Sequence, residues 1–270
     1  MASRNAQTLA NPLSGVNRQG CLTVQANGVY KLVIFMTKLP PIHDVRELPA
    51  YPVAEAAHYL LIPPATIRDW VAGRYYPTQR GRKFSPPIIT LPEPDNRALS
   101  FMNLIEVHVL DGIRRKHQIP LDKVRIALMY LSKKFPSRHL LADAEFETDG
   151  LDLFVQKFGR LINVSQEGQL AMRELLHVHL QRIERDPSGL PIKLYPFTRK
   201  RDSQEPKAVV IDPHVSFGRP VLAGTGIPTA TIAERYKAGE SIDDLADDYG
   251  QTRLQIEEAI RCELWLEKAA

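Results

Sequence analysis

Two short segments near residue 60 carry apolar residues at helical spacing, and this pattern predicts two packed helices. The first segment spans 51–60 and the second spans 65–72, with a turn at 61–64 between them and Gly73 directly after them. The residues that would share the buried faces are Val53, Ala56, Ala57, Leu60, Ile67, Trp70 and Val71. Two short helices joined by a tight turn predict a helix-turn-helix.

A basic segment follows the second predicted helix and is typical of a wing, the hairpin that flanks a recognition helix. Arg80, Arg82 and Lys83 surround Gly81 at its tip, and a further strand is expected over 88–91. Basic side chains in such a hairpin reach phosphates or the minor groove. The side chains expected to bind DNA, with the arginines and the lysine on one face, are Thr66, Arg68, Arg74, Tyr75, Arg80, Arg82 and Lys83.

The run Pro64-Ala-Thr-Ile-Arg-Asp-Trp70 and the basic wing after it resemble the MerR-type winged-helix family, whose pattern is P-x-T-[IV]-R-x-W. The resemblance implies binding to operator DNA. Winged-helix regulators of this kind usually bind two-fold DNA sites as dimers, so it also implies a homodimer. An alternative is that Trp70 is only a core residue and Arg68 only a solvated side chain.

Two longer helices are predicted after the wing. The first spans 99–113 from the cap Ser100, and its buried residues are expected to be Phe101, Leu104, Ile105 and Ile113. The basic residues Arg114, Arg115 and Lys116 follow it, where positive charge suits the end of a helix. The second helix opens at Pro120, with apolar residues at 3-4-3-4 spacing: Leu121, Val124, Leu128, Leu131 and Phe135. That seam indicates two packed helices, either within one chain or between two chains.

The remaining segments are assigned more coarsely. Residues 1–50 are predicted to be poorly ordered, apart from one strand over 29–36, and translation could start at Met1 or at Met36. Residues 51–138 form the predicted DNA-binding domain and 139–197 a small α+β middle unit. Within that unit we expect a hairpin over 146–155 turning at Asp149-Gly150, a helix over 169–180, a turn at 186–189 and a strand over 192–195. The polar stretch 198–206 is a predicted linker.

Glycines and prolines divide the last domain, 207–270, into three short predicted helices. Pro228 opens the first and Gly239 closes it, Ser241 caps the second, and Gly250 precedes the third. The third helix is expected to bury Leu254, Ile256, Ala259 and Ile260. The whole chain is therefore predicted to be mainly α with small β elements, in the α+β class.

Gly224-Thr-Gly-Ile-Pro-Thr229 and the following Ala238-Gly-Glu-Ser241 resemble a small domain of prokaryotic antitoxins. That family carries a G-T-R-I-P-V signature followed by A-G-x-S-x-x-x-[IL]-A-x-x-Y. Gly226 stands where many relatives have arginine, so any function of that arginine does not carry over to this chain.

Charge separates the last domain from the rest of the chain. Residues 61–138 contain 14 Lys and Arg against 6 Asp and Glu, whereas residues 207–270 contain 7 against 11. A basic segment favours nucleic acid, while phosphate would repel an acidic one. We therefore interpret 207–270 as a protein-binding module despite its helix-turn-helix appearance. Solvated helix faces without a partner are the alternative.

A winged helix, a small middle unit and the G-T-x-I-P domain, in this order, resemble antitoxins of the VapB class. The resemblance implies a toxin partner with a PIN-like nuclease fold, which is a magnesium-dependent ribonuclease, and repression of the antitoxin's own operon. Because such nuclease sites are acidic, a cation is expected to enter them, with Arg219 as the first candidate. The residues expected to contact the toxin are Phe217, Arg219, Thr225, Ile227, Arg235 and Arg253. The alternative is a MerR-like regulator whose C-terminal domain senses a ligand or a protein and has no toxin partner.

The sequence contains no recognisable motif for catalysis, cofactor binding or metal binding. There is no Walker loop, G-x-S-x-G or Cys/His nucleophile context, so we predict no enzyme, no catalytic residue, no metal site and no cofactor. Cys21 and Cys262 are far apart, which suits a reducing cytoplasm. The apolar stretches are too short for a membrane span, and no secretion signal is evident.

Overall fold

Two units make up the chain, residues 1–43 and residues 44–270. The computed structural model describes residues 22–26, 29–33, 44–79, 81–93, 95–115, 121–162, 165–199 and 204–264. In the first unit, strands β1 (Leu22–Ala26) and β2 (Val29–Val33) pair antiparallel, with Ala26 opposite Val29. The strand expected over 29–36 is thus present as β2.

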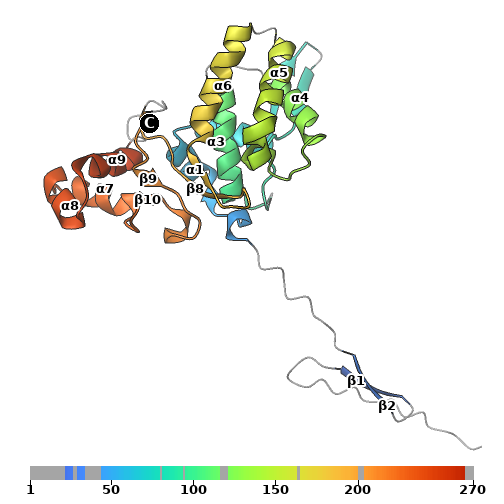
Figure 1. The fold of residues 1–270 in the computed structure, drawn as a ribbon, viewed down its shortest axis with the longest axis horizontal. Helices are drawn as coiled ribbons and strands as arrows, with labels where there is room; N and C mark the ends of the chain where they lie inside the picture. Colours follow the sequence, from blue (N-terminus) through green and yellow to red (C-terminus); the bar gives the residue numbers. More distant parts are fainter. Residues whose placement is uncertain are drawn as a thin grey trace, which may run out of the picture. The chain divides into compact units, whose positions relative to one another are not determined.

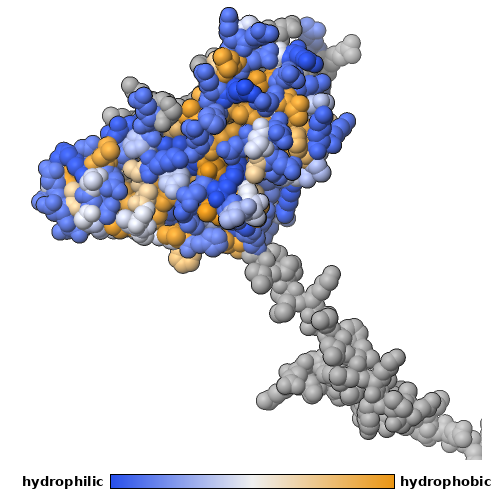
Figure 2. Space-filling model, in the orientation of Figure 1, coloured by the Kyte–Doolittle hydropathy of each residue, from blue (hydrophilic) through white to orange (hydrophobic). Residues whose placement is uncertain are grey.

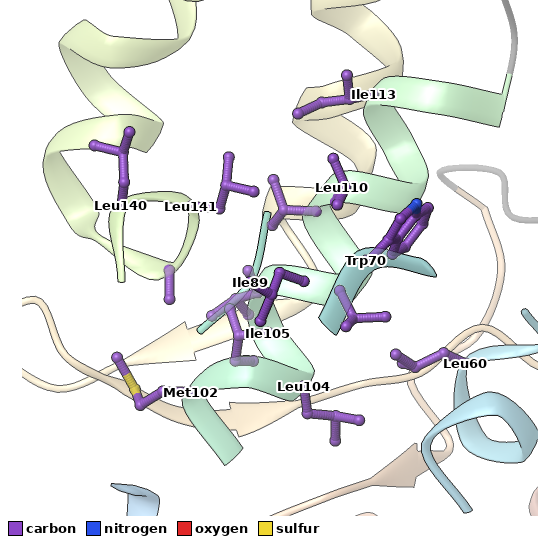
Figure 3. Close-up of a cluster of buried hydrophobic side chains, with 14 of the residues drawn as sticks. Leu60, Trp70, Ile89, Met102, Leu104, Ile105, Leu110, Ile113, Leu140 and Leu141 are labelled. Atoms are coloured by element: carbon purple, nitrogen blue, oxygen red, sulfur yellow. The ribbon is translucent and has the colours of Figure 1, made fainter. Parts of the chain in front are cut away.

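Helix α3 (Phe101–Arg115) is the centre of the second unit. Every residue from Phe101 to Ile113 is buried, although the sequence pattern predicted only one apolar stripe. A helix that is covered all round is a core helix. Figure 3 shows why: Leu60 and Trp70 lie on one side of α3, and Leu140 and Leu141 lie on the other.

The buried polar residues of α3 are held by hydrogen bonds, as burial requires. Glu106 Oε2 lies 3.0 Å from His139 Nδ1 and 3.0 Å from the side-chain amide nitrogen of Asn103. His139 Nε2 lies 3.0 Å from Glu47 Oε2. Burial opposes a charge on His139, but the hydrogen bonds and charges of Glu106 and Glu47 outweigh it and raise the pKa of His139.

The helix-turn-helix consists of α1 (Val53–Leu60) and α2 (Pro64–Ala72), as predicted. A short 3₁₀ turn, Val45–Glu47, precedes it, and strand β3 (Tyr51–Pro52) leads into α1. The expected strand over 88–91 is wrong. The backbone N–H groups of Ile88 and Ile89 both donate to the carbonyl of Trp70 at the end of α2, at 2.8 and 3.1 Å. These two N–H groups are therefore not available to pair with a neighbouring strand. The strand that does form in this region is β6 (Ala98–Leu99), which pairs with β3.

Helix α4 (Leu121–Ser132) contains the predicted apolar seam, and the seam lies within the chain. Val124 and Leu131 are fully buried, and Leu121, Leu128 and Phe135 pack against the same core. The opposite face of the helix exposes two apolar residues, Ile126 at 43% and Met129 at 58%. Figure 1 shows α4 beside α5, with α6 and α3 on the far side of α5.

The predicted hairpin over 146–155 is wrong, because this segment is helical. A π-helical turn, Phe146–Gly150, runs directly into α5 (Leu151–Ile162). Phe146, Gly150, Leu151, Phe154 and Val155 are buried at helical spacing, which outweighs the turn preference of Asp149-Gly150. Gly150 packs against the Phe146 ring, where an added Cβ would lie 3.3 Å away.

The expected helix at 169–180 is present as α6 (Gln166–Leu180), which Ser165 caps by accepting from the Gly168 N–H. A turn at 186–190 joins strands β7 (Ile183–Arg185) and β8 (Pro191–Leu194). A 3₁₀ turn, Leu140–Ala142, lies between α4 and α5.

The buried guanidinium of Arg182 holds the segment after β8 through hydrogen bonds to its backbone. It donates to the carbonyls of Tyr195, Pro196, Glu205 and Pro206 at 2.7 to 3.1 Å. The described ends of the expected linker, 198–199 and 204–206, are therefore packed against the first core, with Thr198 and Glu205 buried.

The C-terminal helices are α7 (Thr229–Lys237), α8 (Ile242–Tyr249) and α9 (Arg253–Leu264), preceded by the antiparallel pair β9 (Val209–Val210) and β10 (Val221–Leu222). The caps agree with prediction: Ser241 Oγ accepts from the Asp244 N–H, and Gly250 is left-handed. The second core is formed by Leu222, Ile232, Leu245, Ile256, Ala259 and Ile260. Leu254 was expected there but is 47% exposed, since it lies two residues, about 200°, from Ile256 on the helix.

The described residues form a mainly α structure with small two-stranded sheets, which confirms the predicted α+β class. The face shown in Figure 2 is mainly hydrophilic over the C-terminal helices, with apolar side chains visible between polar ones. None of the helices in the described ranges is both long and apolar enough to cross a bilayer.

Candidate nucleic-acid interface and protein-binding loop

The turn of the helix-turn-helix is built from a left-handed residue and two prolines. Leu61 ends α1 with φ 54°, and Pro64 occupies the first turn of α2, where its missing N–H costs nothing. Ile67 and Trp70 then enter the core at 0% and 1% exposure, as predicted. Arg68 is left on the solvent side of α2, next to the less exposed Thr66.

The wing follows α2 without a linker, and Gly73 makes this possible. Gly73 has φ 72°, and an added Cβ would collide with the carbonyl of Ser85. Strands β4 (Arg74–Thr78) and β5 (Gly81–Ser85) pair antiparallel, which confirms the predicted hairpin. Tyr75 lies opposite Phe84 with ring centroids 4.9 Å apart, and Tyr75 is 68% exposed.

The hairpin register assigns the basic residues to two faces. Arg82 is opposite Pro77, on the Tyr75 side, while Lys83 is opposite Tyr76, on the Arg74 side. Both are exposed, so the hairpin presents a cation on each face. The expectation that all these cations share one face is therefore wrong, because adjacent strand residues alternate. Arg80 lies outside the described residues.

Arg74 is held beside the recognition helix by an ion pair with Asp69, Nη1 to Oδ2 at 3.2 Å. The two side chains are 54% and 33% exposed, so the pair is screened and contributes little to stability. The pair links the start of the wing to the side of α2 that carries Asp69.

A loop before β10, Ser216–Gly218, presents the most exposed apolar side chain in the described part of the chain. Phe217 is 96% exposed. Ser216 and Phe217 have φ of 49° and 56°, a left-handed conformation that costs about 1–3 kcal/mol in non-glycine residues. Gly218 closes the loop with φ 75° against the Tyr51 ring, whose Cζ lies 3.1 Å from where a Cβ would be.

The six residues expected to contact a toxin have different environments. Arg219 is exposed and has no ion pair among the described residues, whereas Arg235 pairs with Glu240 and Asp248. Arg253 likewise pairs within the domain, with Asp243 and Glu257.

Thr225 and Ile227 have structural roles in the same domain. Thr225 Oγ1 donates to the Leu222 carbonyl at 2.9 Å and accepts from the Ile227 N–H at 3.1 Å. Ile227 packs against the second core. Phe217 and Arg219 are therefore the two predicted contact residues that face solvent without a partner in the described part of the chain.

The C-terminal domain is docked on the helix-turn-helix through α9. Glu263 Oε2 lies 3.4 Å from His58 Nε2 on α1, and Glu263 Oε1 lies 2.5 Å from Thr229 Oγ1. Burial raises the pKa of Glu263, but the hydrogen bonds from His58 and Thr229 outweigh it and lower that pKa. A second contact joins the fully buried carboxylate of Glu258 to Arg199. The sequence carried no signal for these contacts, because the partners are ordinary polar residues far apart in the chain.

No group of three or more His, Cys, Asp or Glu side chains within the described ranges is arranged to hold a metal ion. The geometry instead defines a winged helix-turn-helix protein with a small C-terminal module docked on it. A family model described as "Putative DNA-binding HTH domain" matches residues 49–128, and one described as "Protein of unknown function (DUF433)" matches residues 209–261.

Similar proteins specify the class further. The chain is 30% identical over 230 residues to "Putative antitoxin VapB45" from Mycobacterium tuberculosis, covering 79% of this chain and 93% of that protein. It is 24% identical over 219 residues to "Uncharacterized protein Rv2308" from the same organism, covering 78% and 88%. The crystal structure of Rv2018 from Mycobacterium tuberculosis matches with a TM-score of 0.57 at 26% identity, covering 79% of this chain and 98% of that one. The chain belongs to the VapB-class antitoxin family with an N-terminal helix-turn-helix.

Proposed function

We propose that this protein neutralises a PIN-like ribonuclease toxin by direct binding through the loop at 216–219, and represses its own operon through α2 and the wing. The observation that carries the first half is Phe217, which is 96% exposed on a left-handed backbone beside Arg219, a residue without an ion pair in the described ranges. The family name given to a relative, an antitoxin, supports a toxin partner.

The loop has the properties of an interface hot spot. Aromatic and arginine side chains dominate such spots, and a conformation that is already fixed reduces the entropy lost on binding. Arg219 can form a bidentate pair with the carboxylates of a nuclease site without breaking an internal bond. Arg235 and Arg253 would first have to leave their own carboxylates. Arg219 is therefore the proposed inhibiting cation, and Arg235 and Arg253 rank behind it.

The test uses the full chain and the nuclease encoded by the adjacent gene. Affinity is measured by calorimetry for the unaltered chain, for Phe217→Ala and for Arg219→Ala, with Arg173→Ala as the matched control, since Arg173 is an exposed arginine of α6 outside the proposed contact set. Each loop variant should bind at least about 30-fold more weakly, the effect of a hot spot worth about 2 kcal/mol. The control should bind normally. Unchanged affinity and unchanged rescue of toxin-expressing cells by both loop variants would move neutralisation to another part of the chain.

For the DNA half, Arg68, Arg82 and Lys83 are the exposed cations that support it, with Thr66, Arg74 and Tyr75 beside them. Arg82→Ala should reduce the magnitude of the salt slope of operator affinity by about 0.9, the value for one phosphate contact. An unchanged slope would exclude the wing from the interface.

A homodimer on a two-fold operator is part of the same proposal. The half-exposed Ile126 and Met129 on the outer face of α4 support it, because apolar side chains exposed together mark interaction surfaces. Met129→Glu should give a folded monomer by light scattering and circular dichroism. A dimer that survives this change would place the interface elsewhere.

A further inference from the structure

Arg114, the penultimate residue of α3, lies against the recognition helix. Its guanidinium is positioned over the indole ring of Trp70, with Cζ 5.6 Å from the ring centroid. Trp70 is one of the residues of α2 that enter the core, and it lies beside α3, as Figure 3 shows. Arg114 therefore occupies the place where α2, the end of α3 and the start of the wing come together, and its side chain is partly exposed there.

The donors at this place lack acceptors. Arg114 Nε is buried without a hydrogen-bond partner, and the guanidinium has no ion pair among the residues that the structure describes. The indole Nε1 of Trp70 is also buried without a partner in the same part of the chain. A buried donor without an acceptor costs about 1–3 kcal/mol, so such groups in a folded protein call for an explanation.

Two guanidinium groups and two carboxylates lie near one another at this place. Arg74, at the start of the wing, is near enough to repel Arg114, and the Asp69 carboxylate is already paired with Arg74 at 3.2 Å. Burial lowers the pKa of Arg114 most, and repulsion by Arg74 lowers it further. Asp111 and Asp69 each raise that pKa by less than Arg74 lowers it. Within the described residues neither carboxylate forms an ion pair with Arg114, so no direct contact offsets its charge.

We propose that Arg114 and Arg74 together hold a phosphodiester group of DNA at the base of the wing. This inference rests on the proposed DNA binding. It adds Arg114, which neither the helix pattern nor the wing pattern indicated, to the expected contact residue Arg74. A phosphate supplies a negative charge and oxygen acceptors to the partly exposed side of the Arg114 guanidinium, away from the buried Nε, and arginine suits it through its fork of donors. The contact positions the duplex without reading its sequence.

The experiment measures affinity for a duplex from the protein's own promoter and for a scrambled duplex, by fluorescence anisotropy over a series of KCl concentrations. Arg114→Gln removes the charge, and Arg173→Gln is the matched control, since Arg173 is an exposed arginine of α6 paired with Asp152. In Arg114→Gln the magnitude of the salt slope should fall by about 0.9 for both duplexes, as expected for one lost phosphate contact. The Arg74→Gln, Arg114→Gln double variant should also lose about 0.9, because both guanidinium groups hold the same phosphate and the two changes together remove one phosphate contact. The control should keep the slope of the unaltered chain.

The melting temperature of each variant is measured by circular dichroism, to show that the variant is folded. Where Arg114→Gln melts early, Arg114→Met replaces it, because the methionine retains an apolar stem over Trp70. A folded variant with the unaltered salt slope would overturn the Arg114 site. A slope that falls for the promoter duplex alone would also overturn it, because a phosphate contact acts on every sequence. Failure of the unaltered chain to bind either duplex would refute the proposed DNA function itself, a different result from loss of one contact.

Discussion

Replacing Gly218 with alanine should disrupt the contact between the exposed loop and the helix-turn-helix. Gly218 has φ 75°, and an added Cβ would collide with the Tyr51 hydroxyl and lie 3.1 Å from Tyr51 Cζ. Tyr51 is 2% exposed, so its ring has little room to move away. Two costs arise: a left-handed alanine and an overpacked core.

The two costs have separate magnitudes. A left-handed conformation costs an L-residue about 1–2 kcal/mol. Forcing an extra methyl into a packed site costs about 1–3 kcal/mol. Gly218→Ala should therefore reduce the free energy of unfolding by about 2–5 kcal/mol. Tyr51→Phe should be neutral or slightly stabilising alone, because the Tyr51 hydroxyl is buried without a hydrogen-bond partner in the described part of the chain.

A double-mutant cycle followed by urea unfolding separates the two costs. In the Tyr51→Phe background Gly218→Ala should cost less, leaving the backbone term and a coupling of about 0.5–3 kcal/mol between the sites. Gly226→Ala is the matched control, because an added Cβ at Gly226 meets nothing within 4 Å. Strictly additive effects would refute the Tyr51 contact. A Gly218→Ala variant as stable as Gly226→Ala would refute the strained loop as well.

Three further predictions concern the cores and the contact between them. The raised pKa of His139 means that its protonated form favours the fold; this stabilisation is complete below the unfolded pKa near 6.5 and is lost as pH rises through the folded pKa. The stability difference between the unaltered chain and His139→Gln, followed by urea unfolding, should therefore shrink as pH rises from 6 to 8, and a growing difference would contradict it. Leu131→Ala should cost about 2–5 kcal/mol, because Leu131 is fully buried, whereas Lys133→Ala at an exposed position just after α4 should change stability by under about 0.5 kcal/mol. Equal effects in denaturant melts would place the seam of α4 outside the core. Glu258→Gln should cost about 1–3 kcal/mol, since the buried carboxylate is bonded to Thr198 and Arg199, and an unchanged melting temperature would show that these bonds do not hold α9.

The predicted helix-turn-helix and wing followed from local rules. Ile67 and Trp70 are at helical spacing, and Gly73 is the residue that a left-handed junction requires. The caps Ser241 and Gly250 likewise depend on neighbouring backbone groups alone. These features could be predicted because the interactions that decide them lie within a few residues.

Segments with competing local signals could not be predicted. Asp149-Gly150 favours a hairpin turn, yet burial of Phe146 and Phe154 against the first core makes the segment helical. Ile88 and Ile89 have strand propensity, but the carbonyl at the end of α2 accepts both of their N–H groups. In each case the gain from a distant partner exceeds a propensity worth about 1 kcal/mol or less.

The sequence by itself determined the helices whose apolar spacing and caps are local, such as α1, α2 and α8, and the separation of a basic region from an acidic one along the chain. Only the tertiary structure decided which charges are free. Arg235 and Arg253 are paired within the last domain, whereas Arg219 and Arg114 have no ion pair among the residues that the structure describes. Pairing depends on distances between residues far apart in the chain, and these distances exist only after both cores have formed. In the sequence, an arginine that pairs with a carboxylate of the same chain cannot be told apart from one that is free to bind another molecule.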